Sequence, residues 1–113
     1  MNSKHFRKSH FVICVVIPAF ILLWTSTLTA QDAGAIFTAK CAMCHGKDAT
    51  GKTPMGLKLK ARDLHSPEVQ KVPDAEMRLI IAKGKDKMPA YAEKLNKEQI
   101  DGLVAYVRGL GKK

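Results

Sequence analysis

The chain has 113 residues, of which 46% are hydrophobic, and a formal net charge of +9 at pH 7. This length suits one small domain plus a processing segment. The positive charge would attract acidic proteins, anionic lipid or nucleic acid over long range.

Residues 1–30 have the three-part order of a secretory signal peptide. A basic stretch, Lys4-His5-Phe6-Arg7-Lys8, precedes an apolar run from Phe11 to Trp24 and a polar segment that ends at Ala30. We expect cleavage after Ala30. The mature domain, residues 31–113, is then periplasmic or otherwise exported.

The alternative for the same segment is a retained membrane anchor. The apolar run from Phe11 to Trp24 contains Pro18 and is shorter than the roughly 20 apolar residues that a membrane-spanning helix needs. Cys14 lies in this run without the small preceding residue of a lipoprotein signal, so we expect it to leave with the leader.

The mature chain opens with a predicted helix over residues 32–43. Asp32 can serve as its N-cap. Five residues fall at spacings that place them on one helical face: Ile36, Phe37, Lys40, Cys41 and Cys44. The helix therefore presents both cysteines on the same side.

The most specific feature is Cys41-Ala42-Met43-Cys44-His45, the spacing of a c-type haem attachment site. Two thiols on one helical turn can reach the two vinyl groups of a porphyrin, while the next residue presents its imidazole to the iron. We predict one covalently bound haem c per chain.

Three other interpretations of the motif are weaker. A structural zinc site needs four strong ligands, and the mature chain offers only His65 besides the motif. A thioredoxin-like dithiol needs a βαβ pattern. A disulfide between Cys41 and Cys44 would close a very small loop and stabilise the chain little.

The elements that follow are also helical. Residues 46–54 have the composition of a loop. Ser66-Pro67-Glu68 is a helix start with proline at the first position. A longer helix begins near Asp74 and ends at the natural C-cap Gly84.

Pro89 breaks the helical pattern and pushes Met88 toward an extended conformation. Asn96 and Gln99 then form a capping box, and the last helix runs to about Leu110. No segment has the alternation of a strand. The predicted fold is all-α, a small domain of about four helices around one haem.

The second axial ligand of the iron decides between a closed electron relay and an open, substrate-binding haem. Met43 lies between the cysteines and cannot reach the far face, and Met77 lies on an apolar helical face that suits the core. Met55 and Met88 remain, and the loop set by Pro89 favours Met88. His65 would give a bis-histidine haem, but a surface or capping role suits it better.

The residues resemble the class I single-haem bacterial cytochromes c, especially cytochromes c6, c551 and c553. The resemblance covers nearly all of residues 32–110 and rests on the order of several motifs: Ile36-Phe37, Cys41 to His45, Pro54, Gly84-Lys85, Met88-Pro89-Ala90-Tyr91 and Val104-Ala105-Tyr106-Val107. One departure is Ala33, where the family usually has glycine.

The resemblance implies three contacts. The backbone carbonyl of Pro54 would accept a hydrogen bond from the His45 ring, Met88 would be the distal ligand, and the first and last helices would cross through Phe37 and Tyr106. It also implies an electron carrier that is not itself an enzyme.

The expected partners are a redox donor and a redox acceptor with acidic docking patches. They would meet a monomeric chain at lysines around the haem edge, such as Lys52, Lys83, Lys85 and Lys87. Export and the lack of a binding motif argue against nucleic acid, and membrane association would come only from partners or an uncleaved leader. The alternatives are a haem sensor or small haem enzyme with an open distal position, or an anchored subunit of a larger oxidoreductase.

Overall fold

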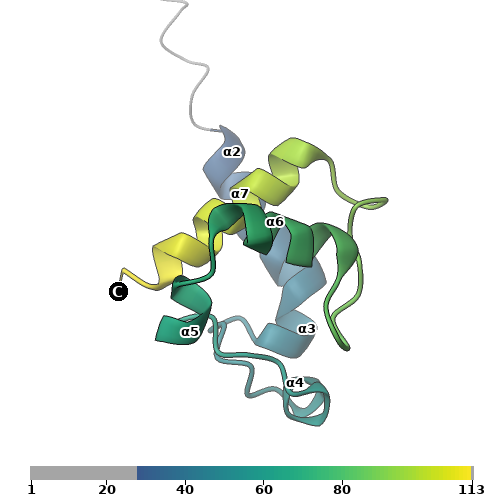
Figure 1. The fold of residues 1–113 in the computed structure, drawn as a ribbon, viewed down its shortest axis with the longest axis vertical. Coiled ribbons are helices and arrows are strands. Elements are labelled where there is room, and N and C mark those ends of the chain that lie inside the picture. The colour runs from purple at the N-terminus through teal and green to yellow at the C-terminus, as the bar shows by residue number, and fades with distance from the viewer. Residues whose placement is uncertain (1–27, 113) are drawn as a thin grey trace, which may run out of the picture.

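A computed structural model describes residues 28–112 (Figure 1), and this part of the chain contains helices but no strand. The predicted all-α class is confirmed. None of the helices within these residues is long and apolar enough to span a membrane. The predicted leader lies outside the described residues except for its last three positions, so its cleavage stays a prediction.

The first helical rod consists of three consecutive segments: α2 (Leu28–Ile36), the π-helix η2 (Phe37–Cys41) and α3 (Ala42–His45). The predicted helix over residues 32–43 is confirmed, but Asp32 is not its N-cap. The helix already includes Leu28, the first described residue, and no glycine or proline stands between Leu28 and Asp32 to interrupt it.

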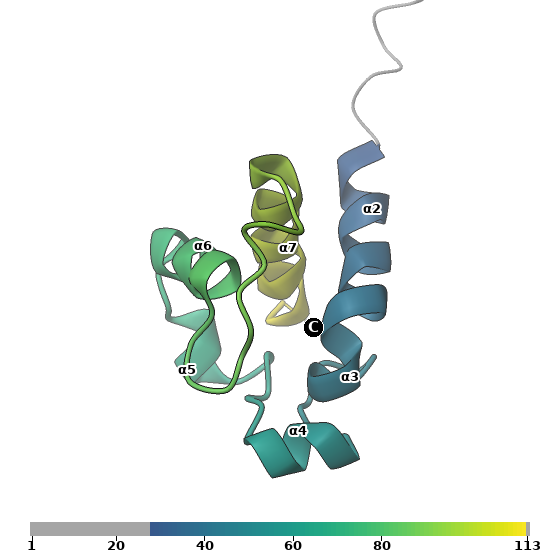
Figure 2. The same cartoon turned by 90° about the vertical axis from the view of Figure 1, so that its right-hand side faces the viewer.

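Helix α7 (Lys97–Leu110) runs beside this rod (Figure 2), as predicted. Its N-terminus carries the expected capping box of Asn96 and Gln99. Its buried face comprises Ile100, Leu103, Val104, Val107 and Leu110. Phe37 packs on Tyr106 with ring centroids 4.9 Å apart, which confirms the predicted crossing of the first and last helices.

Ala33, where the family usually has glycine, fits the packing between the first and last helices. Ala33 is buried, with 3% of its surface exposed. The neighbouring Gly34 faces Tyr106, where an added Cβ would lie 3.6 Å from the ring, which is ordinary van der Waals contact. The two helices therefore pack closely without requiring glycine at either position.

The middle of the chain forms three more helices: α4 (Pro54–Leu59), α5 (Pro67–Gln70) and α6 (Asp74–Lys83). Helix α5 begins as predicted, with Ser66 as its N-cap, and α6 begins and ends as predicted, with Gly84 as its C-cap at φ +75°. Helix α4 was not predicted from the sequence. It adds a short element below α3 to the four predicted helices (Figure 2).

Candidate cofactor site

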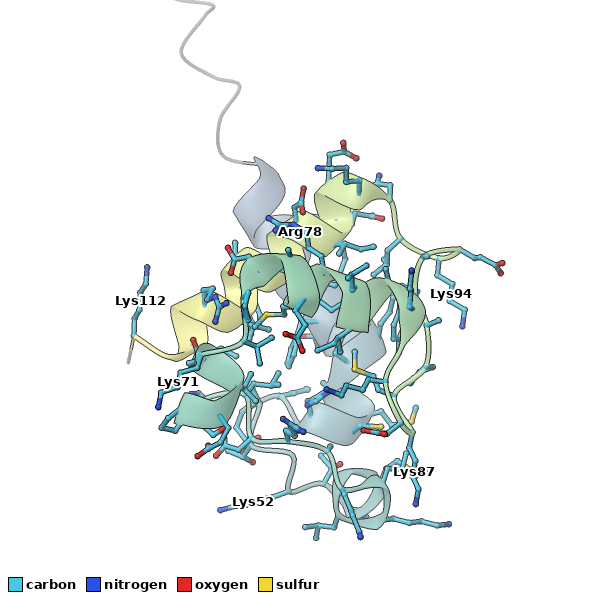
Figure 3. All side chains as sticks on the ribbon, viewed as in Figure 1. Lys52, Lys71, Arg78, Lys87, Lys94 and Lys112 are labelled. Atoms are coloured by element: carbon cyan, nitrogen blue, oxygen red, sulfur yellow. The ribbon has the colours of Figure 1, made fainter. Side chains whose placement is uncertain are left out.

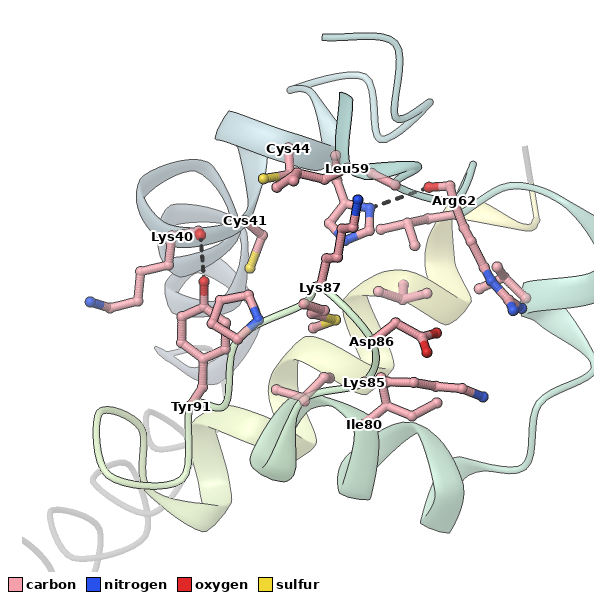
Figure 4. Close-up of a pocket in the computed structure, with 18 of the residues that line it drawn as sticks. Lys40, Cys41, Cys44, Leu59, Arg62, Ile80, Lys85, Asp86, Lys87 and Tyr91 are labelled. Carbon is pink, nitrogen blue, oxygen red and sulfur yellow. Dashed lines mark hydrogen bonds between the residues drawn. The ribbon is translucent and has the colours of Figure 1, made fainter. Parts of the chain in front are cut away.

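The Cys41–His45 motif lies on the wall of a cavity of about 550 Å³. Its other walls come from residues 59–64, from α6, from the loop over residues 85–91 and from α7 (Figure 4). This volume is within the usual range of small-molecule sites, and such sites are mostly apolar with a few well-placed polar groups. Four of the five predicted site residues, Cys41, Cys44, His45 and Met88, therefore line one cavity, and Pro54 does not.

Cys41 and Cys44 are free thiols, and both are half-buried. Burial raises the pKa of the Cys41 thiol, and the charge of Lys40 only partly offsets it. A redox-active dithiol relies on a lowered thiol pKa, so Cys41 does not suit that alternative. Among residues 28–112 no three His, Cys, Asp or Glu side chains gather as a metal site, which leaves the zinc alternative without a ligand set.

The imidazole of His45 is held by one backbone contact. Its Nδ1 lies 3.2 Å from the carbonyl oxygen of Arg62. Burial lowers the pKa of His45, and the Arg62 contact raises it to a lesser degree. The neutral ring, with Nδ1–H donating to the carbonyl, leaves Nε2 as the free nitrogen, which is the form that binds a metal.

This contact corrects the role predicted for Pro54, whose carbonyl was expected to accept from the His45 ring. Pro54 is the first residue of α4, with Thr53 as N-cap. A carbonyl at that position points along the helix toward the amide four residues later. The carbonyl of Arg62, which follows α4 in an irregular segment, occupies the place instead.

Thr53 fastens α4 to the end of the motif helix. Its hydroxyl lies 2.8 Å from the carbonyl oxygen of Met43 and 2.9 Å from that of Cys44, and it accepts the amide hydrogen of Gly56. Gly51 also donates its amide hydrogen to the carbonyl of His45, at 2.7 Å. A Cβ on Gly56 would overlap the carbonyl oxygens of Cys44 and Gly51, so the backbones here are in direct contact.

The methionines of the mature chain differ in how far their side chains are exposed. Met43 is 73% exposed and Met55 is 39% exposed, while Met77 is 6% exposed and belongs to the core. Met88 is partly buried against the core, and its backbone pairs with Lys85 in a tight turn. All four line the cavity, and Met55 and Met88 are the two that belong neither to the cysteine motif nor to the buried core.

His65 does not line the cavity. Its Nε2 lies 2.7 Å from the carbonyl oxygen of Asp48, and its Nδ1 lies 3.2 Å from the carbonyl oxygen of Leu110. Both ring nitrogens thus face backbone acceptors, which raises the pKa of His65. The arrangement contradicts the bis-histidine alternative and agrees with a role of His65 in joining surface segments.

The rim of the cavity is basic. Five basic side chains line it against one acidic side chain, Asp86: Lys40, Lys60, Arg62, Lys85 and Lys87. Of the four lysines predicted for this rim, Lys85 and Lys87 are present, whereas Lys52 and Lys83 are exposed but lie outside it. Other basic side chains, including Lys71, Lys94 and Lys112, project elsewhere on the surface (Figure 3).

The cavity fits the predicted haem. Two thiols and one imidazole occupy one helical turn of its wall, and the lining is otherwise rich in Leu, Ile, Val and Met side chains. A Met-bearing loop forms another wall, and the basic rim could face the propionate groups or a partner. Cys41 and Cys44 would hold the haem covalently, and His45 would supply one axial nitrogen.

The sequence did not reveal two supports of this site. The Thr53-Pro54 pair is an N-cap followed by proline at N1, a signal that could have identified α4. The carbonyl of Arg62 carries no sequence signal, because every residue has one and only the fold decides which carbonyl meets the His45 ring.

Residues 28–107 match the sequence family described as cytochrome C oxidase, cbb3-type, subunit III. The chain is 34% identical to cytochrome c6 of Bryopsis maxima over 64% of this chain and 81% of that protein. It is 35% identical to the cbb3-type cytochrome c oxidase subunit FixPc of Rhizobium leguminosarum over 79% of this chain, but it spans only 32% of that subunit.

A solved structure shows the same fold. The KustC0563 c-type cytochrome is 33% identical to this chain and superposes with a TM-score of 0.65, over 70% of this chain and 96% of that structure.

Proposed function

The chain belongs to the class I cytochromes c and is a haem-based electron carrier, and we propose that it holds the haem iron between His45 and Met88 in an exported protein. The observation that carries this proposal is the meeting of the Cys41–His45 turn and the loop over residues 85–91 around one apolar cavity. When bound, the haem supplies an iron that takes up and releases one electron.

Each proximal residue has a separate role in the proposal. The thiols of Cys41 and Cys44 would hold the haem through two thioether bonds, one to each vinyl group. His45 would present Nε2 to the iron, with the ring tautomer set by the contact of Nδ1 with the Arg62 carbonyl. Such a hydrogen bond also makes the imidazole a stronger ligand.

Met88 supplies the distal ligand in this proposal. Its loop is anchored by the paired backbone of Lys85 and Met88, and its side chain packs against the core. Met55, in contrast, lies on α4 and is 39% exposed. A neutral thioether favours ferrous iron and closes the sixth position to substrates, which suits a carrier that is not itself an enzyme.

The basic rim is the proposed docking surface for redox partners. Met43, which is 73% exposed, lines the same cavity as these basic side chains and adds an apolar contact surface. A partner with an acidic patch would be steered to this side of the molecule. Redox encounters typically bury under about 1,200 Å², so weak and short-lived binding to a monomer is expected.

The test is optical spectroscopy of the protein matured with covalent haem. We expect the ferrous spectrum to be unchanged by added carbon monoxide. We expect the ferric spectrum to show a sulfur-to-iron band that disappears in Met88→Ala. Met55→Ala is the matched control, since it removes another cavity methionine and should keep the band. Absence of covalent haem, or loss of the band only in Met55→Ala, would overturn the proposal.

We also propose that residues 1–30 act as a signal peptide. The mass of the exported protein should correspond to residues 31–113 plus one haem. A mass that includes the leader, with the protein in the membrane fraction, would show an anchor instead.

The match to the cbb3-type family favours a second candidate, a cytochrome subunit of a larger oxidase. Co-purification with other subunits after mild extraction would support it. A protein that purifies alone and exchanges electrons with a soluble acceptor would support the diffusible carrier.

A further inference from the structure

One hydrogen bond connects the Met88 loop to the helix that bears the cysteines. The Tyr91 hydroxyl donates to the backbone carbonyl of Lys40 at 3.0 Å, across 51 residues of sequence. Among the described residues it is the sole hydrogen bond between residues 85–95 and residues 37–45. Figure 4 shows Tyr91 reaching from the loop to Lys40, next to Cys41.

The two ends of this bond lie at unusual places in the fold. Lys40 belongs to the π-helical stretch η2, where Ala42 donates its amide hydrogen to Phe37 five residues back. Such stretches are rare and often lie at functional sites. At the other end, the amide of Tyr91 is fixed on the last turn of α6 through the carbonyls of Ile81 and Ala82, each at 3.1 Å.

Tyr91 is therefore anchored by its backbone to one wall of the cavity and by its hydroxyl to another. Its ring lines the cavity, and Met88 lies three residues before it. Swinging Met88 away from the cavity moves this loop relative to the Cys41 helix, so the bond to Lys40 is strained or broken in that motion. Pro89 between the two residues limits how far one can move without the other.

We propose that Tyr91 is a positioning residue whose bond to Lys40 holds the Met88 loop closed and so favours Met88-ligated iron over the open form. The inference rests on the proposed ligation by Met88. Tyr91 touches neither iron nor partner in this role, and it acts only through the loop.

The expected size follows from the loop equilibrium. An added ligand that displaces Met88 binds only the open form, so its apparent dissociation constant falls as the open fraction rises. One hydrogen bond of ordinary net strength corresponds to a change of about 2- to 12-fold in that fraction. Tyr91→Phe, which keeps the ring, should tighten such binding by this factor.

The experiment is an imidazole titration of the ferric, haem-loaded protein, followed by loss of the sulfur-to-iron band. The matched control is Tyr106→Phe. Tyr106 packs its ring on Phe37, and its hydroxyl has no hydrogen-bond partner among residues 28–112. We expect Tyr91→Phe to tighten imidazole binding about 2- to 12-fold and Tyr106→Phe to leave it unchanged.

Two comparisons separate the possible failures. If Tyr91→Phe lowers the denaturant midpoint but leaves imidazole affinity at the wild-type value, the bond is merely structural and the inference is wrong. If Met88→Ala keeps the sulfur-to-iron band, the proposed ligation by Met88 is wrong, and the inference about Tyr91 falls with it. If Met88→Ala loses the band and both tyrosine variants tighten imidazole equally, the Lys40 bond is not the cause.

Discussion

The two sides of the cavity are held by different kinds of interaction. On the proximal wall, residues 37–62, the contacts are close and involve backbone groups: Gly51 donates to the carbonyl of His45, the Thr53 hydroxyl bonds to the carbonyl of Cys44, and Gly56 has no room for a side chain. On the distal loop, residues 85–91, one paired turn, the amide of Tyr91 and the Tyr91 hydroxyl supply the hydrogen bonds.

The difference indicates which axial ligand can leave. In the proposed haem protein His45 follows two covalent attachment points, and it lies on a close-packed wall, so its displacement would require rearrangement of several segments. Met88 lies on a loop that can move by breaking few contacts. We therefore expect damage to the proximal wall to appear as lost stability, and damage to the distal loop to appear first as lost ligation.

Gly56→Ala should give the largest effect. The added methyl group overlaps the carbonyl oxygens of Cys44 and Gly51, which are backbone atoms and cannot rotate away. Overpacking of this kind costs about 1–3 kcal/mol, measured by denaturant unfolding of the haem-loaded protein. Gly109→Ala is the control. It meets nothing within 4 Å in α7 and should stabilise the protein by up to about 1 kcal/mol. Equal effects of the two variants would contradict the close-packed wall.

Gly84→Ala tests the distal loop in the same way. Gly84 has φ +75°, where an alanine costs about 1–2 kcal/mol, and the new methyl group would press on the carbonyl of Met88. We expect partial loss of the sulfur-to-iron band and new binding of carbon monoxide to ferrous protein. Gly56→Ala should keep that band in the folded protein. If Gly84→Ala lowers the free energy of unfolding but keeps the sulfur-to-iron band, the distal loop does not differ from the proximal wall in the way expected here.

Thr53→Val removes a smaller support from the proximal wall. The valine keeps the branched shape but neither caps α4 nor reaches the carbonyls of Met43 and Cys44. Loss of an N-cap costs about 1 kcal/mol, and we expect a fall of this size in the free energy of unfolding. Thr38→Val is the control, because the Thr38 hydroxyl, at an exposed position, bonds only to the carbonyl of Gly34 within the same helical rod. A similar fall in both variants would show that Thr53 has no special role.

The parts of the fold with strong local signals were predictable from the sequence. The capping box at Asn96, the proline after Ser66 and the glycine at position 84 mark helix ends through local chemistry, and the structure has them as expected. The helix start was misplaced, because Asp32 has the chemistry of a cap but no breaker precedes it. The motif likewise identified the haem, since the spacing of Cys41, Cys44 and His45 is itself the chemical requirement.

The remaining features depend on contacts between distant segments. The Arg62 carbonyl at His45, the Tyr91 bond to Lys40 and the two carbonyls at His65 join residues that are 17 to 51 positions apart. Their side chains or backbone groups have many candidate partners in the sequence. Tertiary structure alone selects one, so no local pattern could predict them.

His65→Gln should give the smallest effect, and it depends on pH. Two carbonyl oxygens, of Asp48 and Leu110, face the two ring nitrogens of His65, so both can be satisfied only when both nitrogens carry a proton. These contacts raise the pKa of His65 in the folded state above its ordinary value of about 6.5. The charged ring therefore stabilises the fold fully below that value, and the contribution is lost as the pH rises through the folded-state pKa.

The measurement is the difference in unfolding free energy between wild type and His65→Gln, at about pH 5.5 and about pH 8.5, on either side of the ordinary histidine pKa. We expect wild type to be the more stable at the lower pH and the difference to shrink at the higher pH. Hydrogen bonds from Thr50 lower the pKa of the nearby Asp48 carboxyl, so it stays ionised at both values and cancels in the comparison. In the proposed ligation His45 binds iron in both proteins, so its contribution cancels as well. A difference that grows with pH would mean that neutral His65 is the form the fold prefers, and that the loop of the proximal wall is not joined to α7 through a charged ring.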